Sequence, residues 1–220
     1  MDKIIPSFRD SLFSDSADVI GDIAELGIDS LLDDGLFKDF PIVGFLIGVT
    51  KTAQNIHDRN LLRQTLNFIK QFNSGKIDTE KLEKYRVEIN ANNKKAEEEL
   101  GRVLIILNNN VELQKSTMLA NLFRNYVNEK ITWLEFCEYS EIVRMMFVND
   151  VKYLGAIYSG KVKDTTGIWL YPIDRLTSLG LVNTAMKSMV ISSAPSGSRT
   201  DKYVNLTAIG GKFYQSIMFD

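Results

Sequence analysis

The sequence contains one cysteine, Cys137, and one histidine, His57. A single cysteine excludes an intrachain disulfide and fits a reducing compartment. One histidine and one cysteine also cannot form the His- or Cys-rich clusters that bind zinc. We expect His57, beside Asp58, to have a structural or helix-capping role, and Cys137 to fill a small core position. Sequence spacing alone leaves a Cys–His catalytic pair open, but no local motif supports one.

Long hydrophobic runs and phosphate-binding loops are missing as well. No uncharged stretch is longer than the one at residues 40–50, which is much shorter than the about 20 apolar residues that one helix needs to cross a bilayer. The start of the chain lacks the basic and apolar pattern of a signal peptide, so we expect no secretion. Neither GxxxxGK[ST] nor a strand–GxGxxG–helix pattern is present. We therefore expect a non-enzymatic protein without a cofactor or a metal.

Charge is distributed unevenly along the chain. Residues 1–40 hold ten acidic and three basic residues, a net charge of −7, whereas the whole chain has −2. Residues 151–220 hold eight basic and four acidic residues, a net charge of +4. We expect the two ends to meet different partners, or each other.

Eight acidic residues alternate with apolar ones over residues 15–39, and the apolar segment 40–49 follows. On a helix, five of these acids form one narrow stripe opposite an apolar side. The stripe is either a solvated face of a helix on a soluble core, or the pore lining of an oligomer that turns its apolar side to lipid. The second interpretation selects these pore and membrane residues: Asp18, Asp22, Glu25, Asp29, Asp33, Ile42, Val43, Phe45, Leu46 and Ile47.

Hydrophobic periodicity divides the chain into three regions. Residues 1–58 are an acidic, apolar and amphipathic N-terminal region. Residues 59–148 show three- and four-residue spacing in successive blocks, which predicts a helical bundle. These blocks are 61–72, 79–89, 100–107, 117–127 and 136–143, and Thr132 and Glu135 form a capping box before the last.

The predicted secondary structure of residues 149–220 includes strands as well as helices. The pattern predicts helices at 150–158 and 168–179, strands at 181–182, 189–191 and 203–206, and a helix to 217 capped by Thr207. This is the order of a winged helix-turn-helix. The predicted fold class is therefore mainly α: a helical bundle followed by a C-terminal winged helix-turn-helix-like α+β domain.

Basic and aromatic residues in the third region are candidates for a ligand site. Basic side chains contact phosphates and aromatic rings stack on bases. The alternative is a solvated basic face over an aromatic core. An excess of four bases is small for a duplex binder, so a short nucleic-acid or nucleotide ligand, or a protein surface, fits as well. The candidates are Lys161, Lys163, Trp169, Arg175, Lys187, Arg199, Lys202 and Tyr203.

Two resemblances add to this interpretation. Residues 174–182 (Asp-Arg-Leu-Thr-Ser-Leu-Gly-Leu-Val) with 203–210 (Tyr-Val-Asn-Leu-Thr-Ala-Ile-Gly) resemble the recognition helix and wing of bacterial winged-helix proteins. Residues 28–36, 37–44 and 56–62 (Ile-His-Asp-Arg-Asn-Leu-Leu) resemble an uncharacterised bacterial family found in antiphage contexts. The layout is similar to the membrane-channel effector of the Hailong antiphage system.

That similarity implies an effector held inactive by a nucleotide-derived oligomer until infection, with no catalytic residue to transfer. It implies a homo-oligomer in the bacterial cytoplasm that associates with the inner membrane. A regulatory protein partner is also compatible with it. We therefore expect a ligand-gated antiphage effector that permeabilises the inner membrane. The alternative is a winged-helix nucleic-acid-binding regulator with a helical oligomerisation domain. A soluble helical enzyme is a third hypothesis, which no catalytic constellation supports.

Overall fold

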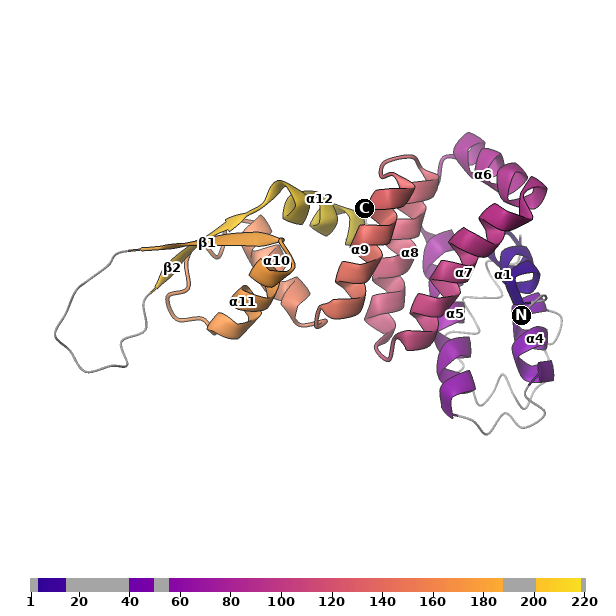
Figure 1. Ribbon diagram of the computed structural model, residues 1–220, viewed down its shortest axis with the longest axis horizontal. Coiled ribbons are helices and arrows are strands. Elements are labelled where there is room, and N and C mark those ends of the chain that lie inside the picture. Colours follow the sequence, from indigo (N-terminus) through magenta and orange to yellow (C-terminus); the bar gives the residue numbers. More distant parts are fainter. Residues whose placement is uncertain (1–3, 15–39, 50–55, 188–200, 219–220) are drawn as a thin grey trace. The chain divides into compact units, whose positions relative to one another are not determined.

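The computed structural model describes residues 4–14, 40–49, 56–187 and 201–218, without the side chains of 47–49 and 56 (Figure 1). Over these residues the chain is mainly helical, with a small antiparallel sheet near the C-terminus. It divides into two compact units. We call the described residues up to 144 the N-terminal unit, and residues 145–218 the C-terminal unit.

The N-terminal unit is built from helices alone in its described part. Short loops join most of them, as the predicted bundle requires. The helices are α1 (Ile4–Leu12), α4 (Pro41–Val49), α5 (Ile56–Ser74), α6 (Thr79–Ala91), α7 (Asn93–Asn109), α8 (Leu113–Val127) and α9 (Trp133–Met145), which ends at the division between the units.

Aromatic side chains fill the core of this unit. The three- and four-residue spacing places Phe68 and Phe72 on one face of α5, and both are fully buried. The ring of Phe123 on α8 lies 5.8 Å from that of Phe68, 5.7 Å from that of Phe72 and 5.5 Å from that of Phe136 on α9. These tilted contacts join α5, α8 and α9 around one apolar centre.

A row of amide side chains on α5 fixes its position along α8. Asn60, Gln64 and Asn67 occur at i, i+4 and i+7, and therefore lie on one face of the helix. Their side-chain N–H groups donate to the carbonyl oxygens of Asn110 at 2.7 Å, Val111 at 2.9 Å and Leu113 at 3.2 Å, respectively. The first two bonds satisfy carbonyl groups of residues that lie between α7 and α8, and the third joins α5 to the first residue of α8.

Side chains cap two helix starts. The sequence offers Asp78 or Thr79 as the cap of the helix over 79–89, and the structure shows that it is Asp78, whose carboxylate accepts hydrogen bonds from the N–H groups of Glu80 and Lys81 at the start of α6. In the predicted capping box, the N–H of Thr132 donates to Glu135 at 2.8 Å, and the N–H of Glu135 donates to the Thr132 hydroxyl at 3.2 Å.

Helices α1 and α4 pack against one another and against α5. Helix α4 begins at Pro41, a position in the first turn that suits proline because its missing N–H would have no partner there. The N–H of Ile42 donates to the hydroxyl of Ser11 at 3.0 Å, and Ile42 and Val43 are 0 % exposed. No helix among the described residues combines the length and apolar character needed to span a bilayer.

The C-terminal unit combines helices α10 (Asp150–Tyr158), α11 (Leu170–Ser178) and α12 (Ala208–Ile217) with strands β1 (Val182–Met186) and β2 (Lys202–Leu206). The strands pair in antiparallel register, with Val182 opposite Leu206 and Met186 opposite Lys202. The strand predicted to begin at 181–182 thus continues to Met186, whereas the one predicted at 189–191 lies outside the described residues.

Two glycines allow the tight joins of this unit. Gly180 ends α11 with a φ of +72°, a left-handed conformation that glycine adopts without a steric penalty. A side chain at Gly210 would collide with the backbone of Leu181, so glycine allows α12 to approach the start of β1. As predicted, Thr207 caps α12 by accepting a hydrogen bond from the N–H of Gly210 at 2.9 Å.

Candidate functional site

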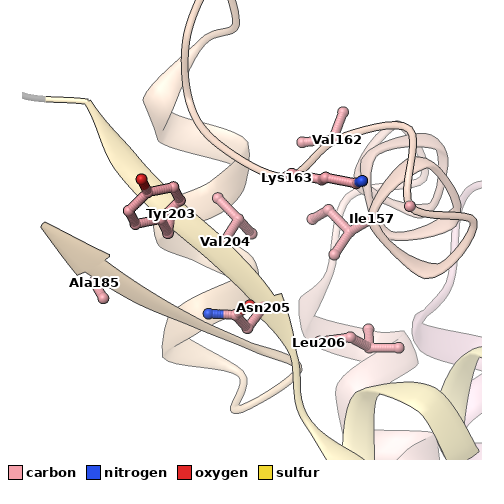
Figure 2. Close-up of a pocket in the computed structure, with 9 residues that line it drawn as sticks. Ile157, Val162, Lys163, Ala185, Tyr203, Val204, Asn205 and Leu206 are labelled. Carbon is pink, nitrogen blue, oxygen red and sulfur yellow. The ribbon is translucent and has the colours of Figure 1, made fainter. Parts of the chain in front are cut away.

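A groove of about 560 Å³ runs along β2 in the C-terminal unit (Figure 2). Its walls are β2, the end of α10 and the loop that follows it, with one residue from β1. The lining residues are Ile157, Gly160, Val162, Lys163, Ala185, Tyr203, Val204, Asn205 and Leu206.

Backbone pairing positions Lys163 beside β2. The N–H of Val204 donates to the carbonyl of Lys163 at 2.9 Å, and the N–H of Thr165 donates to that of Lys202 at 3.0 Å. Residues 163–165 thereby extend the free edge of β2, with Asp164 bridging to Tyr203. The Lys163 ammonium, which is exposed, has no acidic partner among the residues that the structure describes.

The groove offers three kinds of contact. Ile157 and Val204 provide apolar surface, Tyr203 provides an aromatic ring that is 46 % exposed, and Asn205 provides an exposed amide. Lys163 adds a positive charge to this set. The pairing of Asp164 with Tyr203 places Lys163 on the same face as Val204, whereas Tyr203 and Asn205 lie on the other face of β2. The cation with the apolar surface can bind an anionic group, and the ring and the amide border the groove across the strand.

Three other predicted cations of this unit, Arg175, Lys187 and Lys202, are paired with acids. Arg175 forms two hydrogen bonds to the carboxylate of Asp150, at 2.8 and 2.5 Å. Asp150 is fully buried, so the ion pair removes the cost of an isolated buried charge. Lys202 lies 3.5 Å from Asp174 at the surface.

Lys187 is also paired, with Asp164 at 2.7 Å. This hydrogen bond, with further ones from Thr166, lowers the pKa of Asp164 to about 2, and the same bond raises the pKa of Lys187. Of the remaining candidates, Lys161 is exposed and Arg199 lies outside the described residues.

Phe147, Trp169 and Tyr171 form a second feature, which we call the aromatic cluster. Their side chains are 60 %, 66 % and 54 % exposed, respectively. The guanidinium of Arg175 lies between two of the rings, 4.7 Å from the centre of Phe147 and 4.9 Å from that of Tyr171. The rings of Trp169 and Tyr171 are 6.1 Å apart.

The structure describes only some of the predicted pore and membrane residues, and those that it describes differ in burial. The acidic stripe Asp18, Asp22, Glu25, Asp29 and Asp33 lies outside the described residues. Ile42 and Val43 belong to the core of the N-terminal unit, while Phe45 and Leu46 are half-buried. Ile47 is on α4, but its side chain is also outside the described part.

Sequence reasoning missed a buried polar network in the N-terminal unit. The carboxylate of Glu99 accepts hydrogen bonds from the hydroxyls of Tyr85 and Tyr126, both at 2.8 Å. Burial raises the pKa of Glu99, although these hydroxyls and Lys95 favour its charged form. Helical spacing contained the signal, because Glu99 follows the buried Ala96 by three residues and precedes the buried Val103 by four.

Phe147 was missed for a different reason. It lies between α9 and α10, where no helical or strand periodicity assigns it to a face. Its contact with Arg175, 28 positions later in the sequence, depends on the tertiary fold.

The predicted structural residues show no reactive arrangement. His57 is exposed at the start of α5, with its ring 4.0 Å from the carboxylate of Asp58. Cys137 is half-buried on α9, and burial raises the pKa of its thiol, which disfavours the nucleophilic thiolate. Within the described residues, no three acidic, histidine or cysteine side chains gather as a metal site would require.

Comparisons with protein-family models, curated proteins and solved structures find no match for this chain.

Proposed function

We propose that the C-terminal unit is a winged-helix-like sensor that binds a short, phosphate-bearing ligand in the β2 groove. The ligand class is a nucleotide or a short single-stranded nucleic acid. The observation that carries the proposal is Lys163, an exposed cation that lines the groove on the Val204 face and has no acidic partner among the described residues; Tyr203 borders the same groove from the other face of β2. A lysine ammonium is a strong phosphate contact, and an exposed aromatic ring stacks on a base.

Charge pairing makes a DNA duplex a less suitable ligand. In a winged-helix domain, α11 would be the recognition helix that enters a groove of the duplex. Its arginine, Arg175, is already neutralised by Asp150, and Asp174 places an exposed carboxylate on the same helix. A carboxylate at that position repels DNA phosphates, whereas a short ligand in the β2 groove avoids it.

Fluorescence anisotropy with the full chain tests the groove. The probe is a labelled single-stranded octamer of thymidine, titrated at several salt concentrations. We expect Lys163→Gln to weaken binding by about fivefold and to reduce the salt slope by about one, since one phosphate contact is lost. Lys152→Gln is the matched control, because Lys152 is exposed in the same unit but does not line the groove.

Two results would contradict the groove assignment. One is equal weakening by Lys163→Gln and Lys152→Gln, which indicates diffuse attraction to a basic unit. The other is a labelled 20-base-pair duplex that binds more tightly than the octamer. That outcome would favour the alternative function, a winged-helix regulator with a helical oligomerisation domain.

We further propose that the N-terminal unit carries the response of an oligomeric antiphage effector at the inner membrane. The observation in favour is the position of α4, an uncharged helix held on the bundle by the Ser11 hydrogen bond and by burial of Ile42 and Val43. An apolar helix stored against a bundle is a segment that ligand binding could expose to lipid. The acidic segment before it would supply the polar side of the assembly.

Induced expression in a bacterium, with a dye that reports membrane potential, tests this response. We expect depolarisation that is lost in Phe45→Asp, because a charge on α4 opposes its insertion into lipid. Ile105→Asp is the control, since Ile105 is exposed on α7. Val43→Asp is unsuitable, because a buried charge would unfold the packing of α4. Depolarisation that persists in Phe45→Asp would contradict insertion through this helix.

A further inference from the structure

Three amide side chains near the junction of α7 and α8 each have a buried polar atom without a hydrogen-bond partner among the described residues. The atoms are Oε1 of Gln64 on α5, Oδ1 of Asn108 on α7, and Nδ2 of Asn110 between α7 and α8. Gln64 is 0 % and Asn110 is 2 % exposed, so bulk solvent does not reach these two side chains. A buried polar atom without a partner destabilises a fold, and native structures contain few of them.

Hydrogen bonds from α5 bring these amides to one place. The Nε2 group of Gln64 donates to the carbonyl of Val111 at 2.9 Å, and Val111 directly follows Asn110. One turn earlier on the same face of α5, Asn60 donates to the carbonyl of Asn110 itself at 2.7 Å. Asn108 belongs to the last turn of α7, two residues before Asn110. The three unpartnered atoms therefore lie where α5 contacts the end of α7 and the start of α8.

Reorienting the amides does not remove the unpartnered atoms. Turning the amide of Gln64 by 180° would place its oxygen against the carbonyl of Val111, and two acceptors cannot form a hydrogen bond. The Oε1 atom of Gln64 is therefore fixed as a buried acceptor. Turning the amide of Asn110 exchanges a buried nitrogen for a buried oxygen, and either atom needs a partner.

The chemistry of the three atoms selects the ligand. Two of them are acceptors and one is a donor. A cation would satisfy only the two oxygens, and an anion would satisfy only the nitrogen. A water molecule can donate two hydrogen bonds and accept a third, and buried waters make about three bonds to groups of this kind.

We propose that one water molecule binds at this junction as a fixed part of the fold. It accepts a hydrogen bond from Nδ2 of Asn110 and donates to Oε1 of Gln64 and Oδ1 of Asn108. The water thereby adds a contact between α5 and the last turn of α7. This site is independent of the β2 groove, because all three residues belong to the N-terminal unit.

Oxygen-17 relaxation dispersion of the solvent, which counts the long-lived waters of a protein, tests the site in solution with the full chain. We expect Asn110→Leu to lose one long-lived water, because leucine keeps the branched shape of asparagine and removes the donor. Asn109→Leu is the matched control, since Asn109 is the exposed neighbour at the end of α7. It should leave the number of long-lived waters unchanged. Circular dichroism shows whether each variant is folded.

A crystal structure of the natural sequence gives a second measurement, which holds even if Asn110→Leu does not fold. At a resolution that shows ordered waters elsewhere, we expect one water within about 3.2 Å of all three atoms. A direct hydrogen bond between Gln64 and Asn110, or no water between them, would overturn the proposal. So would a folded Asn110→Leu variant that keeps every long-lived water, or an equal loss in Asn109→Leu.

Discussion

The two units treat their aromatic residues in opposite ways. In the N-terminal unit, Phe68, Phe72, Phe123 and Phe136 are fully buried and contact one another through α5, α8 and α9. In the C-terminal unit, the aromatic cluster and Tyr203 are exposed over a small apolar core. Burial of rings supplies stability, whereas their exposure has a cost that only recognition of a partner offsets. The contrast is the reason why we propose recognition through the C-terminal unit.

Charged residues show a related difference. In the N-terminal unit, buried Arg124 on α8 donates hydrogen bonds to the carbonyls of Gln71 and Phe72, at the C-terminal end of α5. A cation at that position stabilises the helix dipole, and burial lowers the pKa of Arg124. In the C-terminal unit, by contrast, three ion pairs neutralise basic residues and leave Lys163 available in the groove. Which cations are free thus depends on pairing rather than on composition.

The largest expected effect is at the centre of the N-terminal core. Phe123→Ala should lower the free energy of unfolding by about 4 kcal/mol, because it leaves a cavity among the rings of α5, α8 and α9. Trp169→Ala should change it by less than about 0.5 kcal/mol in the monomer, as expected for an exposed side chain. Urea unfolding at low protein concentration measures both. Comparable losses would refute the contrast between the units.

The ion pairs of the C-terminal unit should differ in their contribution. Arg175→Ala leaves the carboxylate of Asp150 buried without its partner, so we expect a loss of about 2 kcal/mol, reduced because Arg175 is itself partly exposed. Lys202→Ala removes a surface ion pair and should cost less than about 0.5 kcal/mol. Thermal unfolding followed by circular dichroism separates the two cases. A loss for Lys202→Ala as large as for Arg175→Ala would mean that burial does not distinguish them.

The attachment of α4 should respond to the Ser11 hydroxyl. Ser11→Ala leaves the N–H of Ile42 buried without an acceptor, which should cost about 1.5 kcal/mol. Hydrogen exchange at Ile42 should accelerate, whereas Ser7→Ala on the same helix should have no effect. Unchanged exchange in Ser11→Ala would show that burial of Ile42 and Val43 alone holds α4.

The smallest expected effect concerns the pH dependence of the N-terminal unit. Burial raises the pKa of Glu99 above its unfolded value, so the folded protein binds more protons than the unfolded one between the two values. Glu99 therefore lowers stability as pH rises through this window. The free energy of unfolding of Glu99→Gln, minus that of the natural sequence, should increase from about pH 4 to pH 7. Chemical denaturation at each pH measures it, and a decreasing difference would reverse the assigned pKa shift.

Local patterns predicted the elements better than the site. The helical bundle followed from periodicity, and Asp78, Thr132 with Glu135, and Thr207 marked helix starts because capping depends on residues close in sequence. Helix α8 nevertheless begins at Leu113, four residues before the predicted start at 117, and its N-cap residue Glu112 makes no side-chain capping bond. The missing cap explains why the sequence did not mark this start.

The candidate site depended on contacts that the sequence does not encode locally. Lys163 and Arg175 are both basic residues near aromatic ones, and the sequence treated them alike. The fold separates them by bringing Asp150 to Arg175 and leaving Lys163 in the groove. Such pairing joins residues 25 positions apart and cannot be inferred from composition.

The amide row on α5 has a mechanical consequence. Sliding α5 along α8 by one helical turn, about 5.4 Å, would break the bonds of Asn60, Gln64 and Asn67 together. We therefore expect α5 and α8 to resist sliding past one another. Helix α4 is attached differently, by the hydrogen bond at Ser11 and by burial of Ile42 and Val43, and under the proposed function it is the element that would detach while the pair of α5 and α8 stays intact.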